Sequence, residues 1–193
     1  LGVVVEATVS LVTRPEETRK NNPEFYALYN GKRDSDSKTA NPCLSCEKLF
    51  KDNVDYLRFM FDMYDVPAMS VWPDTPERGR QGILSDYVWN YVNRVAKELY
   101  KTHPDKLIIG GAYSTYWLPP EKIDKLSPNV AVHIVNARRR YDIPEEDAKA
   151  RREAVEKWSE LTDGKVISFM NVGGGANTPK IFAEDIKHIK DHA

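Results

Sequence analysis

The stretch LSDYVWNYVNRVAKELYKTHPDKLIIGGA (residues 84–112) joins two different hydrophobic patterns. The apolar side chains of its first half recur at helical spacing, at Val88, Val92, Val95 and Leu99. Ser85 precedes them and is a preferred N-cap residue, whereas Pro104 cannot continue the helix and ends it. The apolar run at residues 107–112 then predicts a short buried strand. The stretch therefore predicts a helix followed by a strand, the repeating element of a parallel sheet.

Four further short apolar runs have the same strand pattern: residues 2–9, 68–72, 130–135 and 166–170. They show little strict alternation, which is typical of parallel strands covered on both faces. Because helical patterns fall between them, the chain predicts βαβ units in one parallel α/β sheet. We expect the five strands to lie in sequential order. Two architectures fit this pattern, namely about five consecutive units of a TIM-type (β/α)8 barrel or a small doubly wound sheet.

Three more helices are predicted. Residues 47–64 follow Ser45, which we expect to cap the helix. Residues 147–161 end at an Asp-Gly pair (residues 163–164), and a last helix begins at Pro179. Their inward-facing residues are expected to be Phe50, Val54, Leu57 and Phe61, then Ala154, Val155, Trp158 and Leu161, and finally Ile181, Ile186 and Ile189.

Length and composition limit the class of protein. A chain of 193 residues can form one domain with a substantial core, and its formal net charge of −1 gives no reason to expect nucleic acid or an anionic membrane as a partner. No apolar run approaches the ~18 residues needed to span a bilayer, and the start lacks a secretory signal.

Because the chain begins at Leu1 without Met, we expect a fragment of a longer protein with further domains. The polar residues 30–42 predict a long exposed loop.

Two cysteines, Cys43 and Cys46, form a single C-x-x-C motif. A structural zinc site would need two more ligands, and among the histidines only His188 and His192 have the spacing of paired ligands. We therefore expect neither a metal nor a redox function, and instead expect both cysteines to pack around the start of the helix at residues 47–64.

The candidate site follows from the predicted sheet, because ligands of parallel α/β sheets bind at the carboxyl ends of the strands. The polar and aromatic residues on or after the five strands are Glu6, Trp72, Asp74, Tyr113, Tyr116, His133, Asn136, Arg138 and Asn171. Aromatic faces can cover the C–H face of a sugar ring, while carboxylates and amides bind its hydroxyl groups. This set of residues therefore favours a carbohydrate ligand.

Asp74 lies between two prolines and two residues after Trp72, in the stretch WPDTP. Apolar surroundings would raise the pKa of this carboxyl group toward that of a general acid, although Pro-Asp-Thr-Pro is also an ordinary turn. Glu6 lies inside the apolar run VVVEATV, where a carboxylate needs a partner or a wet site. His133 fits a core position as well as a ligand contact.

Two other features admit a functional interpretation. Residues 173–175, Gly-Gly-Gly, would cradle a phosphate at the start of the last helix, but they lack the context of a known phosphate motif and also fit a flexible loop. Arg138 begins a run of three arginines that would bind a carboxylate or phosphate, or would simply be solvated.

The ordered segments NPEFYALYNGKR, CLS, the strand-end Pro-Asp, the stretch from residue 84 to 120 and SPNVAVHIV resemble the bacterial DUF4838 family, a domain of unknown function. The similarity covers residues 22–135 and continues more weakly to the last helix. The family resembles α-glucuronidase-like glycoside hydrolases with (β/α)8 barrels, in exported multidomain proteins that degrade polysaccharides. The resemblance thus implies that this chain is the middle of a barrel in an extracytoplasmic protein.

The chain departs from the family pattern near Asp74. The resemblance places Pro73-Asp74 on a strand-end Pro-Asn-Asp segment, but the preceding Asn is absent. Residues 75–80 replace a cysteine-containing stretch of the family, and Cys46 replaces an Asn after CLS. These differences indicate either a diverged substrate or an altered site.

The leading interpretation is a glycoside hydrolase that acts on polysaccharides or oligosaccharides, including those with uronic acids, and requires no cofactor. The expected general acid is Asp74 and the expected second carboxylate is Glu6. The other expected roles are a sugar platform of Trp72, Tyr113 and Tyr116, hydroxyl or uronate contacts from His133, Asn136 and Asn171, and a uronate partner in Arg138. The alternatives are a non-catalytic carbohydrate-binding barrel and a phosphate-binding α/β enzyme that uses residues 173–175.

Overall fold

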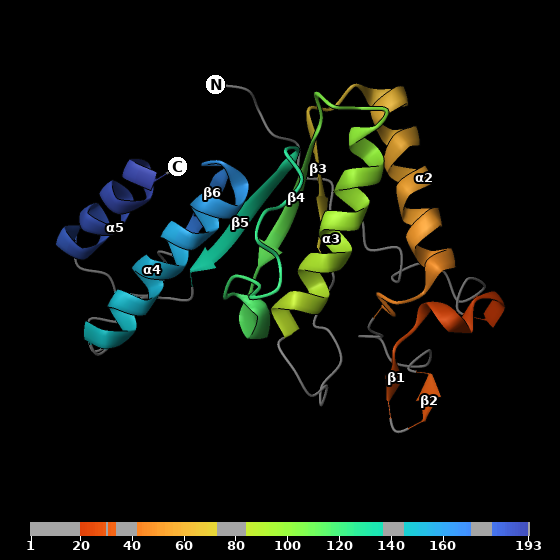
Figure 1. Ribbon diagram of the computed structural model, residues 1–193, viewed down its shortest axis with the longest axis horizontal. Helices are drawn as coiled ribbons and strands as arrows, with labels where there is room; N and C mark the ends of the chain where they lie inside the picture. Colours follow the sequence, from red (N-terminus) through yellow and green to blue (C-terminus); the bar gives the residue numbers. More distant parts are fainter. Residues whose placement is uncertain are drawn as a thin grey trace.

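The computed structural model describes residues 20–29, 31–33, 42–72, 84–136, 145–170 and 179–192. Its centre is a four-stranded sheet of β3 (Ala68–Val71), β4 (Leu107–Ala112), β5 (Val130–Asn136) and β6 (Val166–Met170). All neighbouring strands are parallel, and their spatial order β3-β4-β5-β6 is the order of the sequence (Figure 1). The predicted sequential order is confirmed for these four strands. The strand predicted at residues 2–9 lies outside the described residues.

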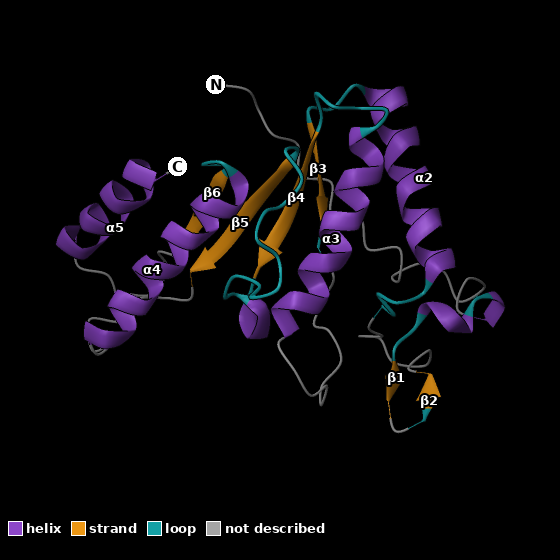
Figure 2. Cartoon of the chain, viewed as in Figure 1, coloured by secondary structure: helices purple, strands orange, loops and turns teal. Residues whose placement is uncertain are grey.

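Four helices accompany the sheet in the described part of the chain (Figure 2), and an α-helix lies between successive strands of the sheet except between β4 and β5. They are α2 (Glu47–Tyr64), α3 (Leu84–Tyr100), α4 (Glu145–Thr162) and α5 (Pro179–His192). Each corresponds to a predicted helix. The protein is thus a mixed α/β structure with a parallel sheet. None of the described helices is long and apolar enough to cross a membrane.

The main core lies on one face of the sheet. Alternate strand residues, such as Met69, Ile108 and Val132, pack there with buried residues of α2, α3 and α4 and with Ile189 of α5. The opposite face carries a separate small cluster of strand residues: Ala68, Leu107, Ile109, Ala131 and Ile167. No residue of the described helices belongs to that second cluster. A doubly wound sheet would carry helices on both faces, so the described part is singly wound.

Two tryptophans form the centre of the main core. Trp89 of α3 and Trp158 of α4 are both fully buried, and their ring centroids lie 4.4 Å apart. Trp89 reaches this position because Gly110 of β4 has no side chain: a Cβ atom there would lie 2.6 Å from Trp89 Cη2. The indole N–H of Trp158 donates a hydrogen bond to the carbonyl oxygen of Trp117 at 3.0 Å. Gly110 thus sets how closely α3 approaches the sheet.

The first described segment packs against the start of α2. A 3-10 helix, η2 (Pro23–Phe25), leads into a hairpin of β1 (Leu28–Tyr29) and β2 (Lys32–Arg33). Phe25 and Tyr26 are buried against Leu49 of α2. Lys32 and Arg33 lie within the loop predicted over residues 30–42 but form a strand, and Gly31 before them has a positive φ of +76°. Residues 34–41 lie outside the described residues.

Three details of the predicted helices are wrong. Cys46, not Ser45, is the N-cap of α2, and no side-chain hydrogen bond caps that end. Ser85 lies inside α3 and is buried, because the helix already begins at Leu84. Ile186 of α5 is 43% exposed rather than inward-facing, whereas Ile189 packs against the core. The spacing of apolar residues located these helices, but it did not determine their caps or every buried position.

An ion pair connects the end of α2 to the start of β4. Asp65 is the C-cap of α2, with φ +46°, and its carboxylate pairs with the ammonium group of Lys106. The hydrogen bond and the charge of Lys106 lower the pKa of Asp65 below its ordinary value of 3.8. The folded state therefore favours the ionised carboxylate, and this stabilisation is present above the unfolded-state pKa and lost as the pH falls through the folded-state pKa.

We predict that Asp65→Asn removes this acid-dependent stabilisation. Asparagine is the closest match for the test because it also tolerates the left-handed conformation of the cap. Wild type should be more stable than the variant at about pH 7, and the difference should shrink as the pH falls through the folded-state pKa of Asp65. Urea denaturation across this pH range measures it. A difference that is independent of pH would contradict the prediction.

Candidate functional site

An aromatic cluster lies at the carboxyl ends of the first three strands of the described sheet. Trp72 directly follows β3, Tyr113 directly follows β4, and His133 is the central residue of β5. The ring centroid of Trp72 is 5.9 Å from that of Tyr113 and 5.4 Å from that of His133, and both contacts are edge-to-face. The parallel register explains these contacts. Gly111 of β4 pairs with His133 of β5, and Gly110 pairs with Val71 of β3, the residue directly before Trp72.

Gly111 makes the contact between Trp72 and His133 possible. A Cβ atom on Gly111 would lie 2.4 Å from Trp72 Cε2 and 2.5 Å from Trp72 Cδ2, so the indole occupies the space of the missing side chain. The two glycines of β4 therefore accept two tryptophans on opposite faces. Gly110 accepts Trp89 on the core face, and Gly111 accepts Trp72 on the other face.

Tyr116 fixes the orientation of Trp72. It ends the short 3-10 helix η3 (Ser114–Tyr116), and its side chain is fully buried. The indole N–H of Trp72 donates a hydrogen bond to the Tyr116 hydroxyl oxygen at 3.1 Å. Tyr116 was expected to present its ring to a sugar. Because the ring is buried, it instead holds Trp72 through this hydrogen bond and presents no face to a ligand.

The remaining members of the cluster differ in exposure. Tyr113 is 46% exposed, Trp72 is partly buried, and His133 is buried at 7% exposure. The exposed Tyr113 ring offers an apolar face with a hydroxyl group at its edge, beside the indole that it meets edge-to-face. The cluster can therefore bind a ligand that combines C–H faces with polar groups.

The other predicted site residues are not placed. The two proposed carboxylates, Asp74 and Glu6, lie outside the described residues, as do Arg138, Asn171 and the glycines at residues 173–175. Asn136 ends β5, where its backbone pairs with Met170, but its side chain is not described. The structure thus brings together Trp72, Tyr113, Tyr116 and His133, and it leaves the acid-base pair as a prediction.

The C-x-x-C motif lies at the N-terminal end of α2. Cys43 is buried, and its Sγ atom is 3.3 Å from Ser45 Oγ. Cys46 packs against the cluster of Phe25, Tyr26 and Leu49, and neither cysteine forms a disulfide. These positions agree with the expected packing around the first turn of the helix.

Three positions with notable surroundings in the structure were not found from the sequence. Gly111 carries no sequence signal that distinguishes it from Gly110. Ser70 lies two residues before Trp72 and is buried, with no hydrogen-bond partner for its Oγ among the described residues. Glu156 lies close to His188 and His192, and these three are the one group in the described part of the chain that has metal-binding geometry. The spacing of the two histidines was visible in the sequence, but the carboxylate comes from another helix.

Comparison with known proteins assigns the family. Residues 74–171 match the family described as Domain of unknown function (DUF4838), and this match covers half of the chain. The chain therefore belongs to the DUF4838 family. The matched segment contains Tyr113, Tyr116 and His133 and begins two residues after Trp72. No curated protein and no solved structure matches the chain.

Proposed function

We propose that this protein binds carbohydrate at the carboxyl ends of its parallel strands and hydrolyses glycosidic bonds there. In this proposal the described sheet is part of the wall of a (β/α)8 barrel. The observation that carries it is the cluster of Trp72, Tyr113 and His133 at that edge of the sheet. The helices that pack on one face of the sheet support the barrel, because a barrel carries all its helices on the outer face.

The chemistry of sugars fits this cluster better than the chemistry of a phosphate ligand. A pyranose has an apolar C–H face that packs on an aromatic ring, and its hydroxyl groups exchange hydrogen bonds with polar neighbours. Trp72 and Tyr113 supply the rings, and the Tyr113 hydroxyl and His133 imidazole supply polar groups. A phosphate site would instead need clustered backbone N–H groups or cations.

Hydrolysis would use the two carboxylates that the sequence supplies. Asp74 is the proposed general acid and Glu6 the proposed second carboxylate, the pair that glycoside hydrolysis requires. Asn136, Asn171 and Arg138 are the proposed contacts to hydroxyl groups or to a uronate carboxylate. If the carboxylate pair is incomplete, the platform of Trp72 and Tyr113 would still bind sugars, so a non-catalytic carbohydrate-binding domain is the second candidate.

We predict that Trp72→Ala lowers the affinity for oligosaccharides by at least ~30-fold, the loss expected when a central aromatic contact is removed. Gly111→Ala should weaken binding as well, because its Cβ displaces the Trp72 indole. The matched control is Gly110→Ala, the same change one residue away. It clashes with Trp89 in the core and should reduce stability while the folded fraction binds with unchanged affinity.

Oligosaccharide ligands are first identified on a panel of neutral and uronic-acid-containing glycans. Isothermal titration calorimetry then measures the affinity of each variant for them. Circular dichroism of each variant verifies that it is folded. A panel without any ligand for wild type, or equal affinities for wild type and Trp72→Ala, would contradict the proposal.

A further inference from the structure

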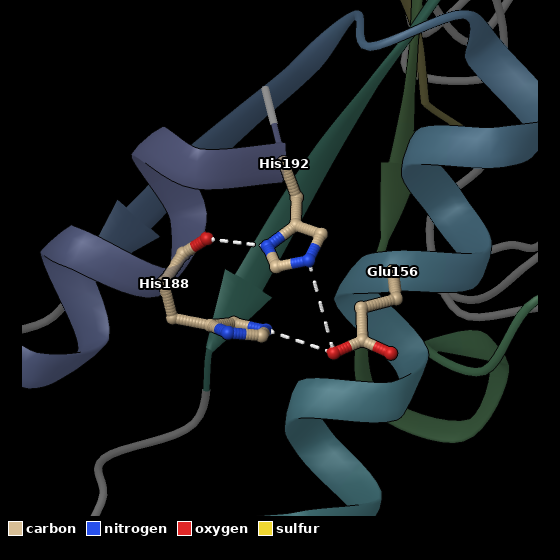
Figure 3. Close-up of side chains that lie close together, drawn as sticks. All are labelled: Glu156, His188 and His192. Carbon is tan, nitrogen blue, oxygen red and sulfur yellow. Dashed lines mark hydrogen bonds and ion pairs between the residues drawn. The ribbon is translucent and has the colours of Figure 1, made fainter.

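A second site, separate from the strand ends, lies between the last two described helices. His188 and His192 are four residues apart on α5, so they share one face of that helix. Glu156 of α4 faces them, and Figure 3 shows both imidazoles directed toward its carboxylate. Glu156 Oε1 is 3.8 Å from His188 Nε2 and 3.9 Å from His192 Nε2. One ligand atom from each residue can be chosen so that all three lie within 4.8 Å of one another.

The hydrogen bonds of His192 prepare its Nε2 atom for a metal. Its Nδ1 lies 2.8 Å from the carbonyl oxygen of His188, a pure acceptor, so Nδ1 carries the proton. The lone pair of the neutral ring is then on Nε2, which is the atom directed toward Glu156. A backbone carbonyl that holds one imidazole nitrogen is the arrangement that orients metal-binding histidines in proteins.

The two imidazole rings of this cluster also lie close to each other. Their ring centroids are 4.4 Å apart. His188 Nε2 additionally lies 3.3 Å from the carbonyl oxygen of Arg152, to which it donates when protonated. Metal binding would replace that proton.

The spacing requires only a small closure. Zn–N and Zn–O bonds of about 2.0–2.2 Å place tetrahedral ligand atoms about 3.3–3.6 Å apart. The observed separations from Glu156 are slightly longer, and all three side chains retain exposure, from 17% for His188 to 44% for Glu156, so they have room to rotate. The Ser159 hydroxyl of α4 donates to the carbonyl oxygen of His192, which fixes α5 against α4 and holds the ligands in register.

We propose that Glu156, His188 and His192 bind a divalent transition-metal ion of the zinc class, with water completing the coordination. Two imidazoles and one carboxylate suit zinc better than calcium or magnesium, which prefer oxygen ligands. The ion fastens α5 to α4. This assignment is independent of carbohydrate binding, because its residues lie on α4 and α5 and not at the strand ends.

The test is a titration of chelator-treated protein with zinc, followed by calorimetry and thermal melting. We expect one zinc ion per chain, and a rise in melting temperature of at least about 4 °C when free zinc exceeds its Kd 100-fold. His192→Gln should weaken binding at least ~10-fold and remove the rise. The matched control is Cys46→Ser, which breaks the C-x-x-C motif and should leave zinc affinity unchanged.

Cobalt substitution in wild type makes the test independent of how well the variants fold. Bound Co²⁺ should show visible d–d absorption without a thiolate charge-transfer band, because its ligands are nitrogen and oxygen. Absent zinc binding in wild type, a thiolate band, or binding that is lost in Cys46→Ser and kept in His192→Gln would each overturn the proposal.

Discussion

Replacement of Asp74 by asparagine is expected to lower turnover of unactivated glycosides by at least ~100-fold, the usual contribution of a general acid. Asparagine keeps the size of the side chain and removes the proton that the leaving oxygen needs. Pro73 restricts the backbone directly before Asp74, so the carboxyl group should have a fixed direction. Trp72, two residues earlier, lies in the aromatic platform and would place the carboxyl group beside a bound sugar.

The leaving group separates this role from simple binding. Aryl glycosides with good leaving groups need little protonation, so Asp74→Asn should reduce their turnover far less than that of natural oligosaccharides. The comparison uses steady-state kinetics on both substrate types with wild type, Asp74→Asn and the binding variant Trp72→Ala. Trp72→Ala should affect both substrate types similarly. Equal losses on both for Asp74→Asn would exclude the acid role and leave Asp74 as a binding or turn residue.

Replacement of Trp89 by alanine should lower the free energy of unfolding by about 3–5 kcal/mol, the range for removing a buried aromatic side chain. Trp89 is fully buried between Gly110 and Trp158, so the resulting cavity would have no access to solvent. Such a loss is a large part of the stability of a typical domain. Guanidinium denaturation followed by circular dichroism measures it.

The two core tryptophans provide a matched comparison. Trp89 and Trp158 are both fully buried, but Trp158 Nε1 donates to the Trp117 carbonyl oxygen, whereas Trp89 Nε1 has no hydrogen-bond partner among the described residues. Phenylalanine at Trp89 removes an unsatisfied donor, while phenylalanine at Trp158 leaves a carbonyl without its partner. Trp158→Phe should therefore be more destabilising than Trp89→Phe by about 1–3 kcal/mol. The reverse order would contradict this account of the core.

The sequence predicted the elements well because the periodicity of apolar residues is a local signal. The helix at 47–64 and the strands at 107–112 and 166–170 were predicted with the observed bounds. The caps were less accurate, since they depend on side-chain hydrogen bonds that the periodicity does not report. The one-sided packing of the helices could not be predicted from the strands, because short apolar runs look alike in singly and doubly wound sheets.

Part of the candidate site was also predictable. Trp72, Tyr113 and His133 lie on or after successive strands, so a parallel sheet in sequential order brings them together. The buried position of Tyr116 and the role of Gly111 depend on tertiary packing, which no local pattern contains. The pairing of Glu156 with the two histidines of α5 likewise required the structure.

The sequential strand order has a consequence for how the protein is made. In the four-stranded sheet β4, β5 and β6 each pair with the strand that directly precedes them in the chain, so each of them leaves the ribosome after that partner. A chain stopped after β4 would already contain the β3–β4 pair and helices α2 and α3. Folding of the described sheet during synthesis can thus advance unit by unit. The aromatic cluster of Trp72, Tyr113 and His133 would be complete once β5 has paired and placed His133 beside Trp72.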